Sequence, residues 1–136
     1  MKFNLNTGDR FKILFCQSKF PKRKVKENLN RYGFEDITFI SGDDDVINTA
    51  KGLDPEVIII NHCNCNDSYT PSVLQQLRKF SDTPVIVWCD EMTDATSQKL
   101  LSNKNTYTLR TSDGFICLTE VLHRVEMKTK NPELWV

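Results

Sequence analysis

Short apolar runs alternate with amphipathic stretches along most of this chain. The apolar runs are rich in Ile, Val and Phe, which is typical of buried parallel strands. The stretches between them repeat apolar residues at helical spacing, as Val73, Leu74, Leu77 and Phe80 do. The pattern predicts strands over residues 11–16, 36–40, 56–60, 83–88 and 106–109, and helices over residues 21–32, 46–50, 71–80, 93–103 and 114–125.

Several expected helix ends have a local physical reason. Pro21 suits a first helical turn, and Gly33 suits the position after a last turn. Residues 41–43 are expected to cap the second helix, and Thr70 the third. The acids at 43–45 favour the positive end of a helix dipole, so a capping cluster explains them better than a metal site.

Strict alternation of strand and helix predicts a parallel sheet with helices on both faces. Right-handed crossovers then favour a doubly wound, flavodoxin-like α/β fold with five strands in the order 2-1-3-4-5. A length of 136 residues suits one domain. We expect an N-terminal extension over 1–10, the domain over 11–127 and a tail or linker over 128–136.

Composition narrows the class of protein further. The 18 basic and 18 acidic residues balance, so no overall charge attracts nucleic acid or an anionic membrane. The apolar run 57–60 is far too short to span a bilayer, and the first residues lack a secretory leader. Five cysteines, an odd number, argue against a secreted disulfide framework. We therefore expect a cytoplasmic protein with reduced thiols.

Ligand sites in such sheets lie outside the carboxyl ends of the strands. Those ends are residues 16–18, 61–63, 89–90 and 110–111. Asn61, directly after the third apolar run, is the most informative residue among them.

The order and spacing of four strands resemble the response-regulator receiver family, the CheY-like phospho-acceptor domains. The resembling segments are 12–16, 55–60, 83–87 and 107–110, and the resemblance covers roughly residues 10–127. The resemblance depends on the order and spacing of these four segments, because no single motif among them is specific.

The resemblance implies a phosphorylation site whose chemistry is mostly lost. An amide replaces the acceptor aspartate, two neutral residues replace the acidic pair that holds magnesium, and a thiol replaces the switch hydroxyl. An arginine replaces the phosphate-pairing lysine, and the switch aromatic is kept. In the same order these positions are Asn61, Gln17 with Ser18, Cys89, Arg110 and Tyr107.

An amide cannot form an acyl phosphate, so the chain is interpreted as a degenerate pseudo-receiver. The resemblance then implies regulation through protein–protein contact in a two-component signalling setting, with no enzymatic activity, cofactor or metal. It also implies a protein partner or homodimer on the face formed by residues 93–101, 106–110 and 115–125. Tyr107 has two interpretations, a rotameric switch or an edge-strand aromatic that packs on the helices.

The cysteines support an alternative function, a thiol- or metal-responsive sensor. Cys16, Cys63, Cys65 and Cys89 all fall near the carboxyl edge, beside His62, and zinc prefers such ligands. Against this, one residue between Cys63 and Cys65 is a tighter spacing than in a zinc knuckle. Buried thiols that pack as small hydrophobes are the simpler explanation.

The basic run of Lys19, Lys22, Arg23, Lys24 and Lys26 follows the first strand. It is either a solvated face or a rim that attracts a carboxylate, a phosphate or an acidic partner surface. Flavin binding is not expected, because residues 17–21 contain no glycine to close on a phosphate. Nucleic acid is not an expected partner, since one short basic run is a weak footprint.

Overall fold

The computed structural model describes residues 11–17, 21–41, 45–64 and 69–130. Of Gln17, His62, Cys63, Asn64 and Tyr69 it describes the backbone. The strands are β1 (Ile13–Gln17), β2 (Ile37–Ser41), β3 (Val57–Asn64), β4 (Val85–Glu91) and β5 (Thr106–Arg110). The helices are α1 (Lys22–Arg31), α2 (Val46–Leu53), α3 (Tyr69–Leu77), α4 (Asp94–Leu101), the 3₁₀ turn η1 (Thr111–Asp113) and α5 (Gly114–Lys130).

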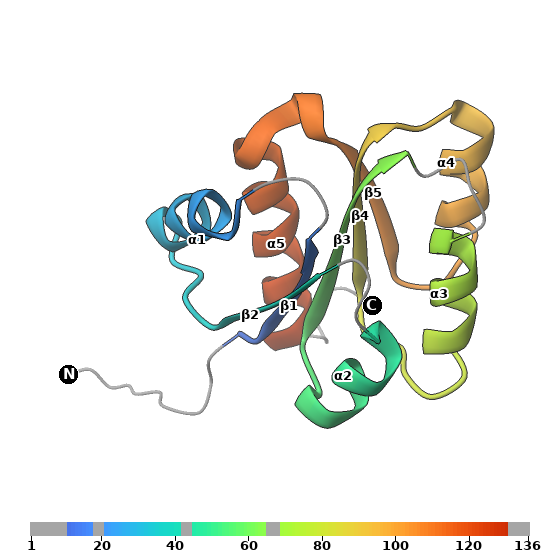
Figure 1. Ribbon diagram of the computed structural model, residues 1–136, viewed down its shortest axis with the longest axis horizontal. Coiled ribbons are helices and arrows are strands. Elements are labelled where there is room, and N and C mark those ends of the chain that lie inside the picture. The colour runs from blue at the N-terminus through green and yellow to red at the C-terminus, as the bar shows by residue number, and fades with distance from the viewer. Residues whose placement is uncertain (1–10, 18–20, 42–44, 65–68, 131–136) are drawn as a thin grey trace.

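The five strands form one parallel sheet in the order β2-β1-β3-β4-β5, which confirms the expected fold class. Helices α1 and α5 cover one face, and α2, α3 and α4 cover the other (Figure 1). Both faces are therefore buried. This is why β3 and β4 have continuous apolar sequences instead of the alternation seen in half-exposed strands.

A row of aromatic rings crosses the sheet on the face that α1 and α5 cover. Phe39 lies 5.6 Å from Phe15, Phe15 lies 6.4 Å from Trp88, and Trp88 lies 5.1 Å from Phe115, measured between ring centroids. Tilted and edge-on rings at such distances attract each other beyond the burial of their area. The row joins the edge strand β2 to the first turn of α5.

Several expected boundaries are wrong by a few residues. Strand β3 continues to Asn64, so the loop expected from residue 62 begins later, and β4 continues to Glu91. The N-cap of α2 is Asp45, whose carboxylate accepts a hydrogen bond from the Asn48 backbone at 3.1 Å. The expected caps at residues 41–43 are therefore wrong for Ser41, which lies in β2, and residues 42–44 lie outside the described residues.

Two further helix ends also differ from expectation. Thr70 lies inside α3 and is fully buried, so it is not the N-cap. Helix α5 runs through Lys130, so residues 128–130, expected in the tail, belong to the helix. The division of the chain into extension, domain and tail stays a prediction.

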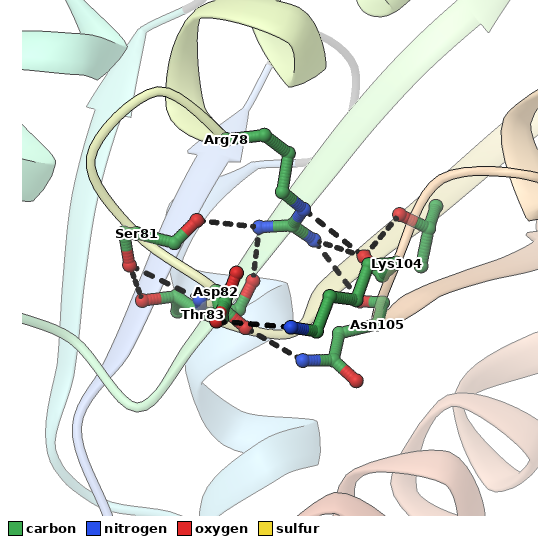
Figure 2. Close-up of polar contacts among 7 residues, drawn as sticks. Arg78, Ser81, Asp82, Thr83, Lys104 and Asn105 are labelled. Carbon is green, nitrogen blue, oxygen red and sulfur yellow. Dashed lines mark hydrogen bonds and ion pairs between the residues drawn. The ribbon is translucent and has the colours of Figure 1, made fainter.

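At the amino edge of the sheet, Arg78 joins two loops (Figure 2). Its guanidinium donates to the carbonyls of Thr83 at 2.8 Å and Ser81 at 3.3 Å, which precede β4. It also donates to Lys104 at 2.6 and 3.0 Å and to Asn105 at 3.3 Å, which precede β5. One planar cation thereby satisfies carbonyls on both connections that lead into the neighbouring strands.

Asp82 strengthens the same junction from the other side. Its carboxylate pairs with Lys104 Nζ at 3.2 Å, and its backbone carbonyl accepts from Asn105 Nδ2 at 2.8 Å (Figure 2). Burial lowers the pKa of the Arg78 guanidinium from its usual value, and the Asp82 charge partly offsets that. Arg78 stays a cation at neutral pH because arginine starts so far above it.

Candidate functional site

The strand ends expected to carry function do meet at one edge of the sheet. In the register of the sheet, Cys16 pairs with Ile60, His62 with Cys89, and Cys89 with Arg110. The structure therefore brings the ends of β1, β3, β4 and β5 together. Gln17 ends β1, and Ser18 lies outside the described residues.

Asn61 is sealed inside the protein. The residue is 2 % exposed, and its Nδ2 donates to the Trp88 backbone carbonyl at 3.0 Å. Trp88 lies opposite Asn61 on β4 and is itself fully buried against Phe15 and Phe115. The amide acts here as a hydrogen-bond donor, a role that an ionised carboxylate cannot take.

Cys89 is also buried, with an exposed fraction of 0 %. Its thiol donates to the Glu91 backbone carbonyl at 3.1 Å, two residues further along the chain. The side chain belongs to the core that α2, α3 and α4 cover. The position expected for a switch hydroxyl thus holds a small, packed group.

Arg110 is half-exposed and turns toward the start of α4. Its Nη2 donates to the Met92 carbonyl at 2.9 Å and lies 3.8 Å from the Asp94 carboxylate. Its backbone N–H donates to the Asp113 carboxylate at 3.3 Å. These contacts use the cation to hold the turn between β4 and α4 against the end of β5.

Asp90 supplies a carboxylate at this edge, and a hydroxyl contacts it. Thr111 Oγ1 donates to Asp90 Oδ1, which ties η1 to the end of β4. Because η1 leads directly into α5, this bond also positions Phe115 in the first turn of α5 against Trp88. This hydrogen bond therefore holds the connection between β5 and α5 against the end of β4.

Tyr107 lies in β5, partly buried against the core that α1 and α5 cover. Lys128 of α5 places its Nζ 3.4 Å from the Tyr107 hydroxyl and 5.9 Å from the ring centroid. A cation over the ring and a hydrogen bond at its tip favour the interpretation of Tyr107 as a packed edge-strand aromatic.

The positions of Cys16 and Cys89 disfavour a disulfide between these two residues. Cys16 and Cys89 are both buried, but β3 lies between their strands, so their Cα atoms are at least about 10 Å apart at normal strand spacing. A disulfide needs Cα atoms within about 7 Å. Cys63 lies on β3, and Cys65 lies outside the described residues. Across the described ranges, no three His, Cys, Asp or Glu side chains converge in a way that would hold a metal.

Sequence reasoning identified the residues at this edge but not their partners. Asn61 donates to the carbonyl of Trp88, and Arg110 donates to the carbonyl of Met92. Every residue has a backbone carbonyl, so the sequence does not reveal which one accepts. The sequence gives no signal for the role of Arg78, because a lone arginine at a helix end resembles any solvated cation.

Among the residues that the structure describes, none of the helices combines the length and apolar character that a bilayer-spanning segment requires.

No protein-family model matches this chain, and no curated protein matches it. Solved structures do. A protein of Burkholderia pseudomallei described as pilus assembly-related aligns with a TM-score of 0.69 at 15% identity, over 92% of this chain and 96% of its own. A fusion that carries residues 181–211 of the yeast Spc42 coiled coil aligns with a TM-score of 0.69 at 16% identity, over 93% and 85%.

A response regulator protein from Burkholderia multivorans aligns with a TM-score of 0.60 at 18% identity, over 84% of this chain and 93% of its own. At such identities the likeness establishes the fold. The chain therefore has a receiver-like, flavodoxin-like α/β fold, as the strand order and spacing predicted.

Proposed function

We propose that this chain is a receiver-like signalling domain that works by contact with other proteins and is not phosphorylated on an aspartyl residue. The observation that carries the proposal is the state of Asn61, which is buried and donates to the Trp88 carbonyl. An acceptor must present a nucleophilic oxygen to a phosphoryl donor. A buried amide held by its own hydrogen bond offers none.

Loss of the metal ligands supports the same proposal. Magnesium sheds its water reluctantly and is held in proteins by carboxylates. The two positions that the receiver resemblance assigns to such carboxylates hold Gln17, the last residue of β1, and Ser18. Asp90, the carboxylate at the end of β4, accepts a hydrogen bond from Thr111.

The proposed working surface is the face formed by α4, β5 and α5. Three large apolar side chains on these helices are exposed: Leu101 by 49%, Ile116 by 63% and Met127 by 47%. Exposed apolar groups on a small domain favour a protein contact when they share a surface with polar groups at its rim. The proposed partner is a second copy or another protein, and cytoplasmic residence is part of the proposal because the cysteine count is odd.

Light scattering after size-exclusion chromatography tests the contact. We expect the wild type to shift from monomer toward dimer as its concentration rises, and Leu101→Glu to remain monomeric. Phe80→Glu is the matched control, because Phe80 is 40% exposed after α3, beside Lys51 of α2, and lies outside α4, β5 and α5. A wild type that stays monomeric at millimolar concentration would remove the homodimer from the proposal.

A magnesium titration followed by isothermal calorimetry tests the lost metal site. We expect no heat of binding for the wild type up to millimolar magnesium. A saturable one-to-one heat, lost in Asp90→Asn, would mean that this edge still holds the ion and would contradict the proposal.

A further inference from the structure

Helix α1 concentrates positive charge in a chain that is neutral overall. Its ten residues contain five cations and one acid, Glu27, for a net charge of +4, while the whole chain has +0. All five cationic residues are exposed: Lys22, Arg23, Lys24, Lys26 and Arg31.

The positive charge of α1 does not serve to stabilise the helix. The first turn contains no acid, and the N-cap Pro21 makes no side-chain hydrogen bond to it. Cations in the first turn interact unfavourably with the helix dipole, so they lower the stability of α1 at this end. Val25 and Leu29, both buried, hold the helix against the sheet instead.

For Arg23 and Lys22, the contacts with described residues offset little of their charge. Glu27 pairs with Arg23 at 3.3 Å, but both side chains are mostly exposed, and such a pair contributes little. Lys22 Nζ lies 5.5 Å from the Phe39 ring, which attracts the cation without neutralising it. The solvent side of α1 therefore presents a positive field.

The kind of anion follows from what else α1 displays. Residues 22–31 contain no aromatic side chain, and Tyr32, 37% exposed at the C-cap, is one ring where a nucleic-acid strand stacks successive bases on several. Their apolar side chains, Val25 and Leu29, are buried in the domain, so none is left to enter a lipid surface. Carboxylates of a protein segment need only the exposed ammonium and guanidinium groups, and ten helical residues span about 15 Å, enough for several such pairs.

We propose that the solvent side of α1 is a docking surface for an acidic segment of a partner protein. Helix α1 lies beside α5 on one face of the sheet, and α4 lies on the opposite face (Figure 1). The inference rests on the proposed function only in treating the domain as a binding module. The docking proposal and the dimerisation proposal are tested by different experiments, so one can be wrong while the other holds.

Fluorescence anisotropy with a labelled 15-residue peptide of alternating Glu and Ser provides the test. We expect saturable binding at 20 mM NaCl that is lost at 300 mM, since the contact is between exposed charges. The triple variant Lys22→Glu, Lys26→Glu, Arg31→Glu should bind at least about tenfold more weakly. Circular dichroism checks that it folds.

The matched control is the triple variant Lys79→Glu, Lys99→Glu, Lys130→Glu, which changes the net charge equally at exposed lysines on other elements. It should weaken binding less than about threefold, because its changes lie outside α1. Equal loss in the two variants would overturn the proposal, as would no binding of the peptide at 20 mM NaCl. Binding of a 15-nucleotide RNA or of phosphatidylserine vesicles without binding of the peptide would also overturn it.

Discussion

At the scale of the residue, the chemistry of the candidate site depends on one amide. The sequence places Asn61 at the end of a strand, and the receiver resemblance says which residue it replaces. Its burial and its bond to Trp88 could not be predicted, because both depend on how β4 and α5 pack beside it. The sequence shows that Asn61 lacks a nucleophilic oxygen. The structure shows in addition that its amide donates a hydrogen bond inside the core.

Because the Asn61 amide donates a buried hydrogen bond, we predict that replacing it with aspartate lowers the free energy of unfolding. In Asn61→Asp the new carboxyl is buried beside a carbonyl, so its folded-state pKa should rise above its unfolded value of about 3.9. A raised pKa means that stability is fully present below the unfolded pKa and is lost as pH rises through the folded pKa. We expect urea unfolding at pH 8 to show a loss of about 2–3 kcal/mol, and a smaller loss at pH 5.

Asn30→Asp is the control for that change, since Asn30 is exposed on α1. It should alter the free energy of unfolding by less than about 0.5 kcal/mol. Equal stability of Asn61→Asp and wild type at pH 8 would mean that the amide is not needed as a donor.

Thiol burial gives a second prediction at the residue scale. Cys16 and Cys89 are closed off, whereas Cys117 is partly exposed. Iodoacetamide should therefore modify Cys117 in the native protein and reach Cys16 and Cys89 only after urea unfolds it. Peptide mapping by mass spectrometry checks this, and rapid native labelling of Cys89 would contradict the packing described for β4.

At the scale of the element, the hydrophobic pattern located all five strands and the helices between them. The ends were less predictable. Strand β3 runs four residues past its expected end at Ile60, and β4 runs three residues past its expected end at Trp88, because the two strands pair with each other there. Asn64 pairs with Glu91 in that extension although neither residue is apolar. Backbone pairing, not local preference, determines those ends.

Arg78 gives the prediction for the connections between elements. Arg78→Ala leaves carbonyls of two loops without their donor and should cost about 2–4 kcal/mol in the free energy of unfolding. Arg78→Lys should recover less than half, because an ammonium lacks the planar fork. Lys79→Ala, at an exposed neighbouring position, is the control and should change little.

Hydrogen exchange would localise the Arg78 effect. Faster exchange should appear first in residues 81–83 and 104–105, where the guanidinium binds. The loss should not vary between pH 6 and 9, since arginine keeps its charge there even with the pKa lowered by burial. A loss below about 1 kcal/mol would show that the junction does not depend on this cation.

At the scale of the whole molecule, one sheet carries both cores, so the two faces should unfold together. In a Trp135→Phe variant, Trp88 is the sole tryptophan and reports the α1–α5 face by fluorescence. Its urea transition should coincide with the loss of helix measured by circular dichroism. Two separate transitions would contradict a single cooperative domain.

The central claim concerns phosphorylation, and intact-mass spectrometry after incubation with acetyl phosphate and magnesium tests it most directly. An active receiver domain in the same tube serves as the positive control. The account predicts that this chain keeps its unmodified mass while the control gains one phosphoryl group. A hydroxylamine-sensitive gain of one phosphoryl group on the wild-type chain would contradict it.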